Sequence, residues 1–135
     1  MGGSGHEGHP DGPATASAGL PVEIAFLAGR GIAPVQLAEA ARRAERRRSE
    51  PAREVLASGL IDEDSYYRAL AAELGLDPIH MAIAFTRQRP FACIPIIGAT
   101  TCDQLDHLLR GLDLVLTPDA LRRIDRLHRD HPLPY

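Results

Sequence analysis

The chain has 135 residues, of which 44% are hydrophobic, and a formal net charge of −3. These values suit one modest domain or two very small ones, and they exclude a basic field that would attract nucleic acid over the whole surface. All 15 residues counted as Lys or Arg are arginines. Chemistry that needs a lysine amine, such as a Schiff base or a P-loop lysine, therefore cannot run on this chain alone.

The cysteines and the chain start suggest a compartment. Cys93 and Cys102 form neither a CxxC pair nor a disulfide framework, which favours a reducing environment. The opening MGGSGHEGHPDGP lacks the basic and apolar regions of a signal peptide. No apolar run reaches the roughly 20 residues of a membrane helix. We therefore expect a cytoplasmic protein without a membrane segment.

The N-terminal residues 1–19 are rich in Gly, Ser, Ala, Pro and His, which predicts a disordered tail. We expect no metal binding by its two histidines, His6 and His9. Residues 20–76 are predicted to form a small helical module. Pro, Gly and Asp signals divide it into helices over about 20–29, 34–48, 51–58 and 63–74, the last with Asp62 as N-cap.

Five arginines crowd the second of these helices: Arg42, Arg43, Arg46, Arg47 and Arg48. Such a cluster could neutralise several phosphates of a nucleic acid. However, glutamates lie nearby at helical spacings for ion pairs, and no aromatic residue is interleaved to stack on bases. We expect a solvated, paired helix face rather than a nucleic-acid site.

The second half predicts a helix over 78–88, apolar almost all round and capped by Asp77, which we expect to be deeply buried. The β-branched run 92–97 predicts a short buried strand that holds Cys93. Two helices follow, with Thr101 or Thr100 and then Thr117 as caps. The expected fold is mainly α with one orphan strand. Because such a strand has no partner, residues 78–116 suggest a piece of a larger α/β barrel.

Four segments carry a resemblance from about residue 74 onward: DPIHMAIAF (77–85), RPF (89–91), IIGATTCDQL (96–105) and LTPDALRRIDRLHRDHPLPY (116–135). They resemble the C-terminal end of aldo/keto reductases, a family of (β/α)₈ barrels. The resemblance implies a barrel fragment made of the seventh helix, eighth strand, eighth helix and tail. It also implies residues that face the adenosine and 2′-phosphate end of NADP: Gly98, Ala99, Thr100, Thr101 and Gln104. Glycine permits close backbone approach, and the helix N-terminus favours an anion.

Two departures from the family pattern limit the expected activity. His107 and Leu108 stand where relatives carry a polar pair for the adenine, and Leu108 cannot donate or accept a hydrogen bond. The family's catalytic Asp, Tyr, Lys and His set has no counterpart, because the chain has no lysine and Tyr66 and Tyr67 lie on a predicted helix. We expect no catalytic residue, no metal ligand and no catalysis by this chain alone. For His80 we expect a satisfied core position, and for His128 and His131 no metal.

Residues 20–79, chiefly EVLASGLIDEDSYYRALAAELGLDPI (54–79), are similar to the helical N-terminal domain of type II secretion ATPases and some bacterial glycosyltransferases. This similarity implies an alternative function, a helical interaction or regulatory module that binds a protein partner through residues 20–76. A fused gene joined near 75–78 would account for both resemblances. The expected parts are then a tail (1–19), a helical module (20–76) and a reductase-like fragment (77–135).

Overall fold

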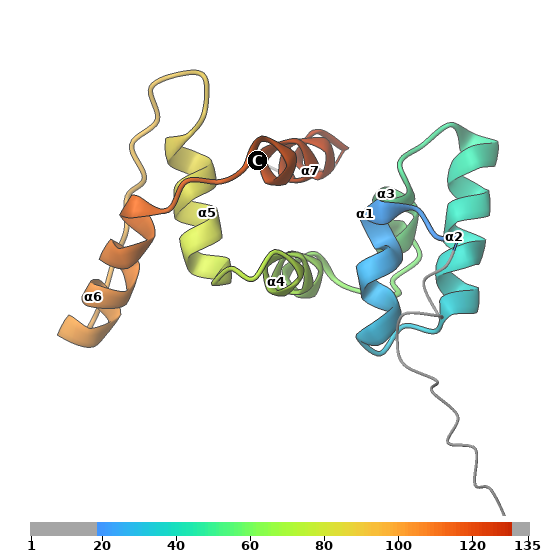
Figure 1. The fold of residues 1–135 in the computed structure, drawn as a ribbon, viewed down its shortest axis with the longest axis horizontal. Coiled ribbons are helices and arrows are strands. Elements are labelled where there is room, and N and C mark those ends of the chain that lie inside the picture. The colour runs from blue at the N-terminus through green and yellow to red at the C-terminus, as the bar shows by residue number, and fades with distance from the viewer. Residues whose placement is uncertain (1–18, 131–135) are drawn as a thin grey trace, which may run out of the picture.

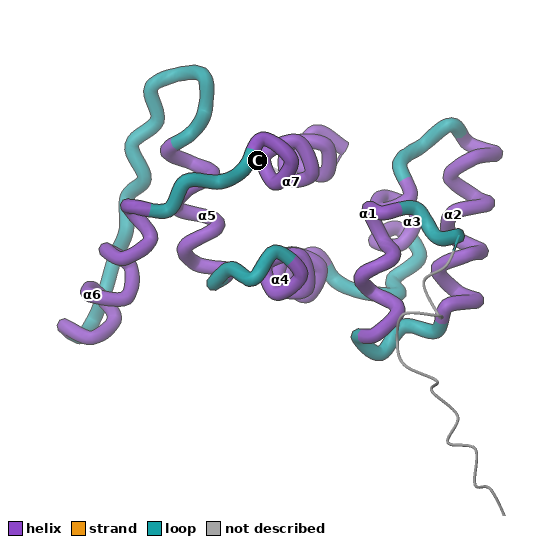
Figure 2. The backbone as a smooth tube through the Cα atoms, viewed as in Figure 1, coloured by secondary structure: helices purple, strands orange, loops and turns teal. Residues whose placement is uncertain are grey.

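A computed structural model describes residues 19–130. Over this range the chain forms seven α-helices and two short 3₁₀ helices, with no strand (Figures 1 and 2). In chain order they are α1 (Val22–Ala25), η1 (Phe26–Gly29), α2 (Pro34–Arg47), α3 (Pro51–Ala57), α4 (Glu63–Glu73), α5 (Pro78–Arg87), α6 (Cys102–Arg110), η2 (Gly111–Asp113) and α7 (Pro118–Asp130). The expected helices are all present. The predicted tail, except residue 19, lies outside the described residues, as do His6, His9 and His131.

The predicted N-caps are confirmed at four helices. In each case a side-chain oxygen accepts a hydrogen bond from a first-turn backbone N–H that has no acceptor within the helix. The pairs are Asp62 with Ser65 (2.9 Å), Asp77 with His80 (3.0 Å), Thr101 with Gln104 (3.2 Å) and Thr117 with Ala120 (3.2 Å). Local sequence therefore sets where these helices begin.

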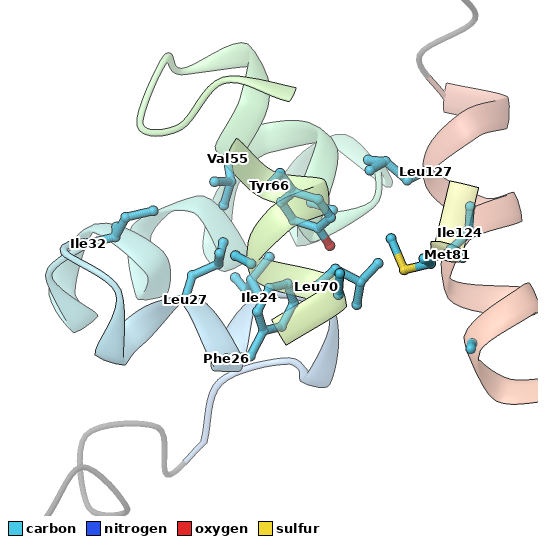
Figure 3. Close-up of a cluster of buried hydrophobic side chains, with 14 of the residues drawn as sticks. Ile24, Phe26, Leu27, Ile32, Val55, Tyr66, Leu70, Met81, Ile124 and Leu127 are labelled. Atoms are coloured by element: carbon cyan, nitrogen blue, oxygen red, sulfur yellow. The ribbon is translucent and has the colours of Figure 1, made fainter. Parts of the chain in front are cut away.

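The helices form an elongated arrangement, with α1, α2 and α3 at one end, α5 and α6 at the other, and α4 and α7 between them (Figure 1). One buried cluster runs through it, and Figure 3 shows Leu70 of α4 near Met81 of α5 and Ile124 and Leu127 of α7. At its edge the Tyr66 hydroxyl donates to the Glu23 carbonyl over 2.7 Å. The cluster holds residues from both sides of the expected boundary at 77, a boundary that stays a prediction.

The predicted strand over 92–97 is wrong. These residues run as a loop in which Ile94 is 88% exposed and Ile96 99% exposed. Cys93, expected to be buried, is exposed as well. A strand needs a neighbour for its backbone N–H and C=O groups, and the part of the chain described here has no strand to pair with it. β-branched composition without a partner does not produce a strand.

Helix α5 is also less buried than its composition predicted. Met81, Ile83 and Ala84 are buried, whereas Ile79 is 44% exposed. Helix α5 packs against α4, α6 and η2, which leave part of its surface uncovered. An apolar helix is therefore buried only as far as its neighbours reach.

Replacing Ile96 with alanine will change the free energy of unfolding by no more than about 0.5 kcal/mol, because the side chain is exposed. In a buried strand the same change would cost about 2–5 kcal/mol. Urea unfolding followed by circular dichroism measures the difference, with Ile124→Ala, at a 4% exposed position, as the matched control. If Ile96→Ala lowers the free energy of unfolding by more than about 2 kcal/mol, the side chain is buried and the exposed loop is contradicted.

Candidate nucleotide-phosphate site

The candidate cofactor residues lie in the loop before α6 and in its first turn. The Gln104 side-chain oxygen accepts hydrogen bonds from the Thr100 backbone N–H (2.9 Å) and the Thr100 hydroxyl (2.8 Å). Thr101 caps the same turn by accepting from the Gln104 N–H. Three of the five predicted residues thus form one hydrogen-bonded group. Gly98 and Ala99 precede it, and all five are exposed.

This group has the chemistry to hold a phosphate. The first turn of α6 presents backbone N–H groups without intrahelical acceptors, at the end of the helix dipole that favours an anion. A Cβ built on Gly98 would meet nothing within 4 Å, so space for a close ligand exists there. Two features oppose phosphate binding. The negatively charged Asp103 carboxylate lies in the first turn of α6. In addition, the Thr100 N–H and hydroxyl already donate to the Gln104 side-chain oxygen. A phosphate would have to displace the Gln104 side chain.

The adenine end of the predicted site is not formed. His107 lies in the last turn of α6 and pairs with α5, its Nε2 being 3.4 Å from Asp77 Oδ2. Leu108 offers no polar side-chain atom. The residues present therefore fit a phosphate and do not fit an adenine ring.

A second polar group lies where α5 meets α6, and the sequence did not predict it. His80 Nε2 lies 2.7 Å from the His107 carbonyl oxygen, and the two imidazole rings have centroids 4.6 Å apart. His80 is thus hydrogen-bonded and half-buried, close to the satisfied position expected for it. His107 lies 27 residues after His80, too far along the sequence to make a recognisable motif with it. The short spacing between Asp77 and His80 was the only available signal.

The carboxylate of Asp77 is held in its charged form. Burial raises the pKa of this carboxyl, but hydrogen bonds from the backbone N–H groups of His80 and Ile79 lower it, with further lowering from the charges of His80 and His107. The net pKa lies below the usual value for aspartate. Asp77 therefore presents a negative charge to both histidines near neutral pH.

The arginine face of α2 is paired with glutamates, as predicted. Glu39 binds Arg42 at 2.9 Å and Arg46 at 3.4 Å, and hydrogen bonds from these arginines lower the Glu39 pKa. Glu54, only 5% exposed, pairs with Arg47 at 3.3 Å and accepts from the Ser49 hydroxyl at 2.7 Å. The binding of a protein partner through residues 20–76 stays a prediction. Over residues 19–130, none of the helices is long and apolar enough to cross a membrane.

Comparisons with known proteins agree with the resemblance of the second half. The sequence model of the Aldo/keto reductase family matches residues 26–129. Protein tas of Escherichia coli is 41% identical over 68 residues, which cover 50% of this chain and 20% of that protein. The putative voltage-gated potassium channel subunit beta of Schizosaccharomyces pombe is 27% identical over 75 residues, which cover 54% of this chain and 22% of that protein. No solved structure matches.

The family match begins earlier than the sequence indicated. It starts at residue 26 rather than at about 74, and it spans 75–78, where a junction was expected. The similarity of 20–79 to secretion ATPases and glycosyltransferases, and the junction itself, stay predictions. The chain spans about one fifth of the length of the curated relatives named above. Because the matched range takes in most of the 135 residues, this chain belongs to the aldo/keto reductase family.

Proposed function

We propose that this chain carries the phosphate-binding end of the family's nucleotide site and holds the 2′-phosphate of NADP weakly, without catalysing a reduction by itself. The observation that supports it is the hydrogen-bonded group of Thr100, Thr101 and Gln104 at the N-terminus of α6, which follows Gly98 and Ala99. When bound, NADPH supplies a hydride for carbonyl reduction. Residues 77–130 then correspond to a C-terminal fragment of the family's barrel.

Each residue has a defined part in this proposal. Gly98 leaves room for the phosphate beside the backbone, and Thr100 donates its hydroxyl and N–H once Gln104 moves aside. The exposed N–H groups of α6 complete the contact. Binding should be weak, with a dissociation constant on the order of 1 mM, because an exposed site gains little from excluding water.

The test is a titration with 2′,5′-ADP, which carries the 2′-phosphate, against 5′-AMP, which lacks it. We expect saturable changes in the backbone amide NMR signals of residues 98–104 with 2′,5′-ADP and much smaller ones with 5′-AMP. Thr100→Ala should weaken binding about fivefold, the loss expected for one hydrogen bond of about 1 kcal/mol. The matched control is Thr86→Ala on α5, whose hydroxyl donates to the Ala82 carbonyl instead. Equal responses to the two nucleotides, or equal weakening by both substitutions, would contradict the proposal.

A further inference from the structure

Asp77, His80 and His107 come together where the N-terminus of α5 meets the last turn of α6, the two helices that lie side by side in Figure 1. One carboxylate oxygen and two imidazole nitrogens lie within 4.8 Å of one another. Two imidazoles and a carboxylate are a common ligand set for Zn²⁺. We propose that these three residues bind a Zn²⁺ ion that fixes α6 to α5.

The spacing of the first two ligands suits a tetrahedral ion. Asp77 Oδ2 and His107 Nε2 are 3.4 Å apart, which is longer than a good hydrogen bond. Two ligands at about 2.1 Å from Zn²⁺, at a tetrahedral angle, are about 3.4 Å apart. An ion can therefore enter between these two atoms without separating them, and a His80 ring nitrogen lies within 4.8 Å of both.

Hydrogen bonds around the ligands orient them. Asp77 Oδ1 accepts from the N–H groups of Ile79 (2.8 Å) and His80 (3.0 Å), which fixes the carboxylate and leaves Oδ2 for a cation. The carbonyl oxygen of His107 can only accept, so His80 Nε2 donates its hydrogen to it. In the neutral ring this leaves the lone pair on Nδ1. Metal-bound histidines commonly donate their other N–H to a carbonyl or carboxylate in this way.

The surrounding charges favour a cation. The Asp77 carboxylate and the carbonyl groups at the C-terminal end of α6 attract a cation, and they act against the positive end of the α5 dipole. His107 is partly exposed, with 44% of its side chain accessible, so an ion can reach the group from solvent. Three protein ligands leave a fourth position for water, which is the arrangement of an open zinc site.

The ion would strengthen an attachment that is otherwise made by few contacts. Helix α6 has no buried residue and packs on α5 and η2. Its polar contacts with the start of α5 include those of His107 with Asp77 and His80. The zinc site lies at the end of α6 opposite Thr101 and Gln104, so it stands independently of the proposed phosphate contact.

The test uses the full chain with His6, His9 and His131 replaced by alanine, so that terminal histidines cannot bind the metal. Calorimetric titration should show one Zn²⁺ per chain, with a raised midpoint of thermal unfolding. Co²⁺ in place of Zn²⁺ should give the intense visible absorption of a tetrahedral site. Asp77→Asn keeps an N-cap oxygen and removes the charge. This variant should lose at least tenfold in affinity while keeping its circular dichroism spectrum.

His107→Ala should behave like Asp77→Asn, because His107 is partly exposed and its removal leaves the buried cluster intact. The matched control is His128→Ala on α7, whose ring packs against Phe85 and should leave zinc affinity unchanged. Absence of saturable binding at micromolar zinc would overturn the proposal. Equal affinity in the parent, Asp77→Asn and His107→Ala would overturn it too.

Discussion

Replacing Leu70 with alanine will lower the free energy of unfolding by about 2–5 kcal/mol, the range measured for buried leucines. Leu70 is 1% exposed and lies on α4, the helix that separates the two ends of the molecule (Figures 1 and 3). Helix α4 packs on both η1 and α5. Truncation removes contacts and leaves a cavity that neighbouring helices can fill only partly.

The matched control for Leu70→Ala is Leu105→Ala on α6, where the leucine is 44% exposed. The loss there should be no more than about 0.5 kcal/mol. Urea denaturation followed by far-ultraviolet circular dichroism measures both variants, and the slope against denaturant shows whether unfolding stays cooperative. If the two substitutions cost the same free energy, Leu70 does not lie in a packed core.

Substituting alanine for Gly111 will destabilise the junction of α5 and η2 by about 1–3 kcal/mol, the usual cost of forcing a methyl group into a packed site. A Cβ at this position would lie 3.0 Å from His80 Cα, 3.1 Å from His80 Cδ2 and 3.3 Å from Ile83 Cδ1. The first of these is a backbone atom, so relief requires helix α5 to shift. The backbone of Gly111 has a φ of −69°, which alanine adopts easily, so the effect is steric.

Gly29→Ala is the control for this prediction, because a Cβ on Gly29 would meet nothing within 4 Å. Thermal unfolding of both variants should show a clear loss for Gly111→Ala and a change of no more than about 0.5 kcal/mol for Gly29→Ala. Gly111→Ala should also weaken Zn²⁺ binding, because His80 moves with α5. A Gly111→Ala protein as stable as its parent would show that α5 and η2 are not packed as the structure has them.

The helices were predictable because their signals are local. Asp62, Asp77, Thr101 and Thr117 each cap a helix within three residues of the N–H group that they bind. The candidate phosphate residues came instead from the resemblance to the aldo/keto reductases, and their role stays a prediction; the structure shows only that Thr100, Thr101 and Gln104 interact within a single turn. Such contacts depend on the backbone of one segment and need no other part of the chain.

The prediction of a strand over 92–97 was wrong for the opposite reason: it depended on a part of the chain outside the segment. Its composition is that of a buried strand, but strand formation is decided by a neighbour that shares backbone hydrogen bonds, and composition does not report whether one is present. The burial of α5 was overestimated on the same ground, since the covering helices, and not its own side chains, set how much of Ile79 is exposed.

The sequence by itself determined the helices, their caps, the paired arginine face and the resemblance to the aldo/keto reductases. These features depend on hydrogen bonds, charge spacings and motifs between residues that are close together in the sequence. Only the tertiary structure brought His107 to Asp77 and His80, and only it left Ile94 and Ile96 in solvent. These outcomes depend on how separate segments pack, and packing is set by which surfaces meet in space.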